Sequence, residues 1–292
     1  MPLAPRRSEF TKPPSALRYM TLALWPSPGL RPGAPFPSII MYWRGYRASA
    51  REVDRFCFLS GVPAGEDLPF LFPHAIGFRL QMALLTHPAF PVPIWRVLQI
   101  RNHLGQHRTI RRNALLDLEA SISGHRVLEK GLEVDVRCAV TEAGELAWEC
   151  TNTFYARGRF GTPGSASPLS PAPAVNGNET ARWRTAEDGA LPFGTLTGDY
   201  NGIHLWDPYA RLFGFKRAFL HPQRVLAQCL ARLGAMPSAH PRHLDAWLKG
   251  PVPYGAQASL RTARTRAGEV LFALVTDQDE RPAIIGRLRC AA

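Results

Sequence analysis

Apolar and polar residues alternate with a period of two along three stretches in the first half of the chain. In residues 116–123 every even position is apolar and every odd position is polar, and residues 132–137 follow the same rule. Residues 145–155 continue the pattern. Such alternation is typical of β-strands with one buried and one solvent-exposed face. We therefore expect an antiparallel sheet here, with hairpin turns at residues 124–125 and 143–144.

Each set of strands follows one mostly apolar helical segment. The first such segment is residues 73–85 and the second is residues 222–233. The second begins at a proline, which suits a first helical position, and Gly234 lies where a helix C-cap residue would. The strands expected after it are residues 245–254, 256–265, 269–276 and 283–290, with turns at residues 267–268 and 278–279.

The two halves share this order of elements and a weak internal repeat. His74 lies seven residues before Gln81, as His221 lies seven residues before Gln228. Residues 158–177 between the halves are rich in Pro, Gly, Ser and Ala, which is typical of a linker. One apolar helix packed on an antiparallel sheet, twice over, predicts two α+β units. The expected organisation is an irregular N-terminal extension (1–34), a first unit (35–157), a linker (158–178) and a second unit (179–292).

Composition and charge exclude some classes of protein. Of the 292 residues, 46% are hydrophobic and 20% charged, which rules out disorder throughout. No apolar run approaches the ~20 residues that span a bilayer. The net charge of +12 would suit a nucleic-acid partner, but the basic residues are scattered, with no run longer than a pair such as Arg6-Arg7. We therefore expect neither a nucleic-acid nor a membrane partner.

The cysteines and the N-terminus indicate a compartment. The cysteines number five, are widely spaced and form no C-x-x-C motif, so neither a disulfide framework nor a zinc site is expected. The first 33 residues are basic, with Glu9 as their one acid, but their apolar run at 19–25 is short and ends at Pro26, unlike that of a signal peptide. A cytoplasmic protein is the prediction, with a transit peptide as the alternative.

One short segment of the second half carries residues suited to acid–base chemistry. Asp199, Asn201 and His204 fall within six residues, beside Gly198 and Gly202. Because glycine permits a tight, irregular backbone, the three side chains can converge on one point. A carboxylate and an imidazole at one point can remove one proton and deliver another, and an asparagine can orient a water molecule. The alternative is an ordinary turn, where Asp, Asn and Gly commonly gather.

The longer segment resembles the signature of the MaoC-like dehydratase family, which includes the R-specific enoyl-CoA hydratase 2 enzymes. That signature reads roughly S/T-G-D-x-N-P-aliphatic-H-x5-A, followed by G-F and by a histidine that opens the central helix. The chain matches it at Thr197, Gly198, Asp199, Asn201, Ile203 and His204, with Ala210, Gly214-Phe215 and His221 following in order. The resemblance implies a hot-dog fold, in which a sheet wraps one long helix. With the repeated order of elements, it implies a double hot dog of the α+β class.

The resemblance also implies a reaction, the interconversion of trans-2-enoyl and (R)-3-hydroxyacyl thioesters of CoA or acyl carrier protein. Asp199 and His204 match the family's catalytic pair, which holds the water that is added or removed. Asn201 and Gly198 match the positions that orient this water and the substrate. No metal or redox cofactor is implied. A positive surface would attract the phosphates of CoA or an acidic carrier protein.

The first half lacks the catalytic pair. Counted from Gly61 as from Gly198, it has Val62, Ala64 and Asp67 where the second half has Asp, Asn and His. One active site per chain is therefore expected, and in the family such a degenerate half makes room for a longer acyl chain. Six apolar residues of the first half either line that acyl pocket or pack the core: Phe70, Leu71, Phe72, Ile76, Phe78 and Met82.

Two residues depart from the family pattern. Gly202 replaces a proline, which loosens the loop but removes no functional group. Pro222 replaces a glycine whose N–H helps to bind the thioester oxygen, and proline has no N–H. Gln223 or His221 at the helix N-terminus would then supply the donor, or the activity is altered or lost. A non-catalytic acyl-thioester-binding protein and a hot-dog thioesterase therefore remain alternatives, and the oligomeric state stays open, a homodimer being one option.

Other candidate sites give weaker signals. His103 and His107 have zinc-motif spacing but lack the glutamate of that motif and lie in a strand-like stretch. His240 and His243 flank Pro241 and are expected in a loop, so no metal site is predicted. The chain has no G-x-S-x-G, G-x-G-x-x-G or P-loop pattern, which argues against serine hydrolases and against Rossmann or Walker-type nucleotide binding.

Overall fold

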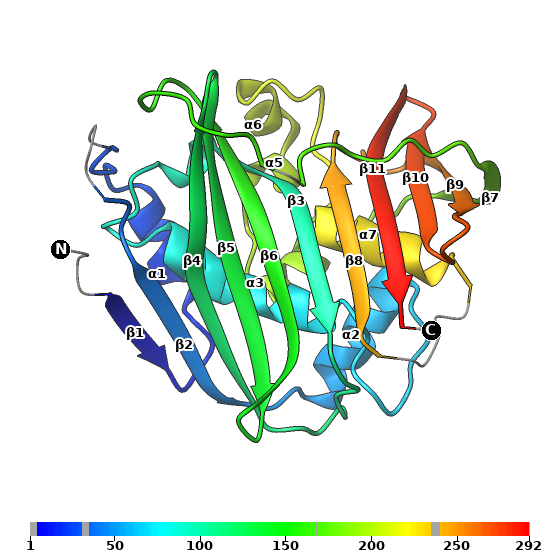
Figure 1. Ribbon diagram of the computed structural model, residues 1–292, viewed down its shortest axis with the longest axis horizontal. Coiled ribbons are helices and arrows are strands. Elements are labelled where there is room, and N and C mark those ends of the chain that lie inside the picture. The colour runs from blue at the N-terminus through cyan, green and yellow to red at the C-terminus, as the bar shows by residue number, and fades with distance from the viewer. Residues whose placement is uncertain (1–4, 31–34, 168, 235–239, 292) are drawn as a thin grey trace.

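A continuous sheet forms the framework of the protein. The computed structural model describes residues 5–30, 35–167, 169–234 and 240–291. Within these residues, an eleven-stranded sheet has the order β1-β2-β4-β5-β6-β3-β8-β11-β10-β9-β7 (Figure 1). In this order, the strands of the first half of the chain come first, from β1 to β3, and those of the second half follow, from β8 to β7. The halves meet where β3 pairs with β8 in antiparallel fashion.

The elements of the first half include the expected helix and strands. They are β1 (Arg6–Phe10), α1 (Ala16–Ala23), β2 (Ile39–Tyr46), α2 (Ala50–Ser60), α3 (Phe72–Leu85), a 3-10 turn (Ile94–Arg96), β3 (Val97–Gln106), β4 (Leu116–Leu128), β5 (Gly131–Glu142) and β6 (Glu145–Arg157). The strands predicted from alternation lie within β4, β5 and β6, and the turn expected at residues 143–144 is confirmed by the positive φ of both residues.

The elements of the second half follow a similar order. They are β7 (Asn178–Arg184), α4 (Leu191–Thr197), α5 (Gly202–Leu205), α6 (Asp207–Leu212), α7 (Pro222–Ala231), β8 (Arg242–Leu248), β9 (Gln257–Arg264), β10 (Val270–Thr276) and β11 (Asp279–Cys290). Between β6 and β7 the described residues form neither helix nor strand and cross from one half to the other (Figure 1). The division into units at 35–157 and 179–292 remains a prediction, since the sheet is continuous across both.

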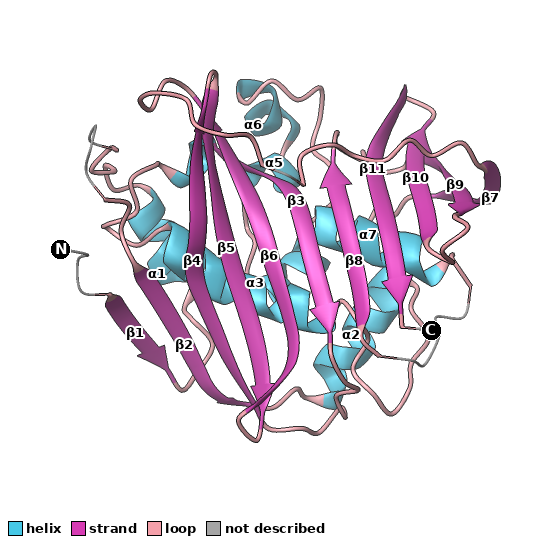
Figure 2. Ribbon diagram, viewed as in Figure 1, coloured by secondary structure: helices cyan, strands magenta, loops and turns pink. Residues whose placement is uncertain are grey.

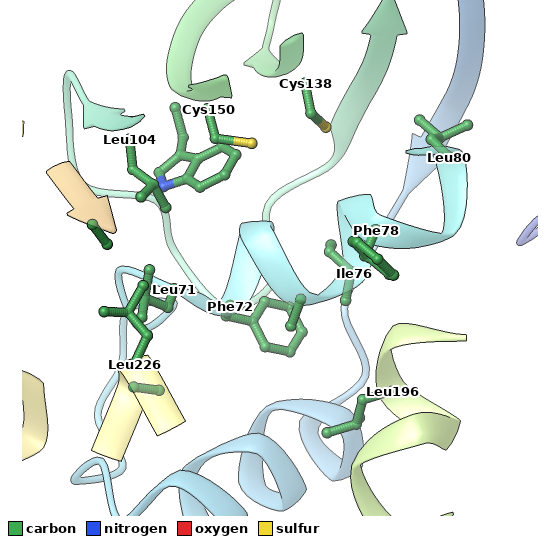
Figure 3. Packing of buried hydrophobic residues seen from close by; sticks show 14 of the residues in the cluster. Leu71, Phe72, Ile76, Phe78, Leu80, Leu104, Cys138, Cys150, Leu196 and Leu226 are labelled. Atoms are coloured by element: carbon green, nitrogen blue, oxygen red, sulfur yellow. The ribbon is translucent and has the colours of Figure 1, made fainter. Parts of the chain in front are cut away.

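The helices cover one face of the sheet (Figure 2). Among the described helices, α3 has the largest share of buried residues. Its residues are apolar on nearly every side, which is typical of a central helix rather than a surface helix. Gly77 lets it approach β5 closely, because a Cβ there would lie 2.8 Å from the Cys138 sulfur. Figure 3 shows Phe72, Ile76 and Phe78 along this helix. None of the described helices has the length and hydropathy needed to cross a membrane.

The N-terminal segment is not irregular, and that prediction was wrong for its described residues. Residues 6–10 form β1, which pairs in parallel with β2 at the edge of the sheet, and residues 16–23 form α1. Ser15 caps α1, and Tyr19 is buried at 2% exposure. The segment lacks a regular apolar pattern because it adds to an existing edge rather than forming its own core. Residues 1–4 and 31–34 lie outside the described residues.

Three local predictions also need correction. Residues 124–125 are not a turn, because β4 absorbs Gly124 as a register shift and continues to Leu128. The strand expected at 245–254 is β8, which includes His243 and ends at Leu248, before prolines that cannot donate to a ladder. Gly234 is not the C-cap of α7, which ends at Ala231 with Arg232 as its C-cap.

Candidate active site

The segment after α4 forms a tight loop that leads into the short helix α5. Gly198 ends α4 with φ of 72°, a left-handed conformation that favours glycine. Asn201 is the N-cap of α5, and its side-chain oxygen accepts a hydrogen bond from the Ile203 N–H at 3.2 Å. These two local signals, a C-capping glycine and an N-capping asparagine, hold the backbone between the helices in one conformation.

The loop brings Asp199 and His204 together. The Asp199 Oδ2 lies 3.7 Å from the His204 Nε2, and the residues are 7% and 4% exposed. The other carboxylate oxygen of Asp199 accepts a hydrogen bond from the Asn201 N–H at 3.1 Å, which fixes its orientation. A carboxylate and an imidazole thus face each other, largely removed from bulk water.

The hydrogen bond at one ring nitrogen of His204 indicates its tautomer. Its Nδ1 lies 2.9 Å from the Phe219 carbonyl oxygen, and because a carbonyl only accepts, the proton is assigned to Nδ1. The Nε2 therefore presents a lone pair to the Asp199 carboxylate, which is also an acceptor when ionised. Two acceptors share no hydrogen between them. A water molecule beside both could donate one hydrogen to each, which suits the pair to binding water.

Burial favours the neutral form of both imidazoles at this site. It lowers the pKa of His204, against the opposing charge of Asp199 and the bond to the Phe219 carbonyl. Burial, reinforced by His204, lowers the pKa of His221 to about 3. The His221 Nε2 donates to the Asp199 carbonyl oxygen at 3.0 Å, and its ring stacks on that of His204 with centroids 4.2 Å apart. His221 therefore supports the loop, and the nitrogen making this bond is not free for a thioester.

Sequence reasoning missed several groups that hold this loop. The Phe219 ring packs edge-on against His204 with centroids 4.8 Å apart. The Tyr254 hydroxyl donates to the His204 carbonyl oxygen at 3.1 Å. The Tyr19 hydroxyl donates to the Gly198 carbonyl oxygen. Tyr254 and Tyr19 lie 50 and 179 residues from their partners in the chain, so no local motif could have revealed them.

A cavity of about 290 Å³ opens beside the pair and contains Asp199, Asn201 and His204 in its lining. Its apolar wall comes from both halves of the chain, with Phe78, Met82, Leu85 and Phe154 from the first and Phe215 and Phe219 from the second. Of the six apolar residues considered for an acyl pocket, Phe78 and Met82 line this cavity. The other four are buried and do not line it: Phe70, Leu71, Phe72 and Ile76.

The N-terminus of α7 borders the same cavity. Pro222 is its first residue, and Gln223 follows at 2% exposure, with both in the cavity lining. The Gln223 side-chain nitrogen donates over a long 3.4 Å to Gln99, and its oxygen is buried without a partner among the described residues. Its backbone N–H lies in the first turn, where a helix offers no acceptor of its own. Gln223 therefore has hydrogen-bonding capacity that its neighbours leave unused.

No second pair occupies the corresponding loop of the first half within the residues that the structure describes. Val62 stands where the second half has Asp199, and Asp67 forms an ion pair with Arg111 at 3.1 Å. His74 is fully buried, with its Nε2 3.2 Å from the Asn152 side-chain oxygen. Burial lowers the pKa of His74 to about 4, which favours a neutral core residue.

Two histidine groups bear on metal binding. Asp199, His204 and His221 place potential ligand atoms within 4.8 Å of one another, so this set could hold a metal ion. In the arrangement seen, however, each of the two histidines already donates one ring N–H to a backbone carbonyl. A metal ion would therefore compete with water for the Asp199 carboxylate and for the other ring nitrogen of each histidine.

The second group is the spaced pair identified in the sequence. His103 lies 2.9 Å from Asp245, and His107 lies 3.1 Å from Glu149. His103 lies on β3, as expected from the strand-like sequence around it, and His107 directly follows the last residue of that strand, Gln106. Because each histidine contacts a different carboxylate, these contacts do not indicate a shared metal site for the pair.

Comparison with known proteins identifies relatives of this chain. No protein-family model matches the sequence. The chain is 27% identical over 191 residues to 3-hydroxyacyl-thioester dehydratase X of Mycobacterium tuberculosis (strain ATCC 25618 / H37Rv), covering 63% of this chain and 66% of the relative. It is 28% identical over 179 residues to the peroxisomal enoyl-CoA hydratase 2 of Arabidopsis thaliana, covering 56% and 51%. The match thus spans less than two thirds of either relative.

Solved structures establish the fold. The crystal structure of HtdX from Mycobacterium tuberculosis superposes with a TM-score of 0.73 at 22% identity, over 86% of this chain and 100% of that one. A MaoC-like dehydratase from Phytophthora capsici gives a TM-score of 0.71 at 17% identity, over 87% and 95%. A further Mycobacterium tuberculosis protein, described as having a double hotdog fold, gives 0.54 at 15% identity, over 85% and 94%. The α+β double hot-dog prediction is confirmed. In sequence the chain is similar to the two named relatives, and in fold to MaoC-like dehydratase structures.

Proposed function

We propose that the chain is a hydro-lyase that interconverts trans-2-enoyl and (R)-3-hydroxyacyl thioesters. The observation that carries this proposal is the arrangement of Asp199 and His204, two buried acceptors 3.7 Å apart at the wall of an apolar cavity. This geometry suits a bound water beside an acyl chain. The names of the two relatives, a 3-hydroxyacyl-thioester dehydratase and an enoyl-CoA hydratase 2, support the same reaction.

In the hydration direction, the water donates one hydrogen to the Asp199 carboxylate and one to the His204 Nε2. The water oxygen forms a bond to C3 of the enoyl group, and one water proton passes through the pair to C2. The π electrons of the double bond become the new C2–H bond, and the other proton stays on the hydroxyl. Dehydration reverses these steps, and neither direction requires a metal or a redox cofactor. The Asn201 amide, in the cavity lining, helps to orient the water.

Negative charge develops on the thioester oxygen as the C3–O bond forms, and a hydrogen-bond donor must stabilise that charge. We assign this role to the backbone N–H of Gln223 at the positive N-terminal end of α7, since Pro222 has no N–H. One such donor typically contributes about 3 kcal/mol to the transition state. Gly198 and His221 act on this chemistry indirectly, by shaping and holding the loop that carries Asp199.

The acyl carrier is either CoA or an acyl carrier protein. The net charge of +12 favours both, because CoA carries phosphates and carrier proteins are typically acidic. A reducing compartment such as the cytoplasm is proposed for the chain. Its five cysteines are free, and four of them are buried, which agrees with that setting.

The direct test is turnover by the purified chain. Enoyl-CoAs of short and medium length, and the same acyl groups on acyl carrier protein, should lose the absorbance of the conjugated thioester. A chelator in a parallel reaction should leave the rate unchanged. Release of free thiol would indicate a thioesterase instead, and saturable binding without product would indicate the non-catalytic protein that Pro222 makes conceivable. Absence of hydration across all chain lengths and both carriers would contradict the proposal.

The pH dependence of turnover follows from the buried imidazole. Burial lowers the pKa of His204, so its neutral, proton-accepting form persists to a lower pH than for an ordinary histidine. We expect kcat/KM to stay level as the pH falls through about 6.5, the ordinary histidine value, and to decline only below it. The measurement is kcat/KM against pH with a substrate that does not titrate in this range. An acid limb centred at or above that value would contradict the neutral state of His204.

A further inference from the structure

The N-terminal segment contacts the loop that carries Asp199. It is attached at three places: β1 pairs with β2, the Ser27 hydroxyl donates to the Phe90 carbonyl oxygen at 3.1 Å, and α1 contacts the loop through Tyr19. The Tyr19 side chain is buried in the hydrophobic core, and its hydroxyl donates to the Gly198 carbonyl oxygen. The segment is thus folded against the site.

Gly198 is enclosed between Tyr19 and Arg79. A Cβ added to Gly198 would lie 2.2 Å from the Tyr19 hydroxyl oxygen and 3.0 Å from the Arg79 Cγ. Arg79, one of the few partly exposed residues of α3, donates from Nε to the Leu196 carbonyl oxygen at 3.1 Å and from its guanidinium to the Thr195 carbonyl. The last carbonyls of α4 and the residue before Asp199 are therefore held by groups outside the second unit.

The backbone around Asp199 is held from both sides. The carbonyl before it accepts from Tyr19 of α1, and its own carbonyl accepts from His221 of α7. Burial raises the pKa of Tyr19 well above that of an ordinary tyrosine, so the hydroxyl keeps its hydrogen and remains a donor. A small rotation of the Gly198–Asp199 peptide would move the carboxylate relative to His204, and such misplacement is costly for proton transfer.

We propose that Tyr19 is a positioning residue for the reaction, and that the N-terminal segment is thereby part of the active-site framework. Tyr19 acts through Gly198 and is not among the residues that line the cavity beside Asp199 and His204. This inference rests on the proposed function for its kinetic consequence, although its structural content does not depend on it.

The test compares Tyr19→Phe with Tyr46→Phe in the full chain. Tyr46 is a matched control, because it is also a buried tyrosine but its hydroxyl has no partner among the described residues. Hydrogen–deuterium exchange should be about fivefold faster for the amides of residues 199–206 in Tyr19→Phe, the effect of losing one hydrogen bond. With enoyl thioesters, kcat should fall about tenfold while KM stays within about twofold. Tyr46→Phe should alter neither quantity.

The two readouts separate this inference from the proposed function. If the unaltered chain shows no turnover, the proposed function fails, and the exchange of the loop still decides the role of Tyr19. Unchanged loop exchange in Tyr19→Phe would overturn the inference. So would a lowered thermal midpoint with unchanged kcat, since that is the result of a purely structural role.

Discussion

Asp199→Asn is expected to lower kcat by about a thousandfold with little change in KM or in thermal stability. The amide has nearly the shape of the carboxylate, and its oxygen can still accept the hydrogen bond from the Asn201 N–H. Its nitrogen, however, would face the His204 Nε2, 3.7 Å from the present Oδ2, and would donate to the lone pair that we assign to the water. The variant therefore removes a proton acceptor and blocks its partner while leaving the loop in place.

Asp207→Asn is the matched control for this prediction. Asp207 lies eight residues further along in α6, is about half exposed, and accepts the Ala218 N–H at 2.8 Å. Because an amide oxygen accepts the same bond and the side chain does not line the cavity, kcat should stay close to that of the unaltered chain. Steady-state rates and a thermal unfolding curve for both variants decide the matter. An Asp199→Asn protein that keeps more than about a tenth of kcat would exclude Asp199 from the proton transfer.

The features predicted correctly from the sequence are those that depend on neighbouring residues. Alternation over a few positions was sufficient for β4, β5 and β6, since the two faces of a strand repeat every second residue. The proximity of Asp199 and His204 was predictable for the same reason: they lie five residues apart, and Gly198 and Asn201 have the conformational preferences that the loop requires. The roles proposed for this pair remain to be tested.

The features that were missed depend on contacts between distant segments. The pairing of β3 with β8, which makes one sheet of two halves, joins residues about 140 positions apart and leaves no local pattern. Tyr19 was missed likewise, because only the fold brings α1 to the loop that carries Asp199. Gly124 shows a different difficulty, since a glycine between polar residues suits a turn and a bulge equally, and the partner strand decides which forms.

A second large effect is expected on stability, from an ion pair close to the join between the halves. Arg101 lies on β3, beside β8, and its guanidinium contacts Glu133 of β5 at 2.5 Å. Both side chains are nearly inaccessible, at 6% and 5% exposure, and Arg126 contacts the same carboxylate at 3.0 Å. Glu133→Ala would leave the Arg101 charge buried without its partner. We expect the free energy of unfolding to fall by about 3–5 kcal/mol, measured by urea denaturation.

The control for this prediction is Glu66→Ala, which breaks an ion pair of similar length on the surface. Glu66 contacts Arg111 at 3.0 Å, but its side chain is 88% exposed, so solvent screens the attraction. A loss below about 1 kcal/mol is expected there. The difference between the two variants in lost free energy of unfolding tests whether burial of the ion pair, rather than the ion pair itself, determines the loss.

The double variant Arg101→Met, Glu133→Ala tests the physical cause of the loss. If the cost of Glu133→Ala comes from an uncompensated buried charge, removing that charge should restore a large part of the lost stability. If the cost came instead from a cavity or from altered strand pairing, the second substitution would add to the loss. Recovery of stability in the double variant would therefore show that the Glu133 carboxylate stabilises the fold by neutralising Arg101.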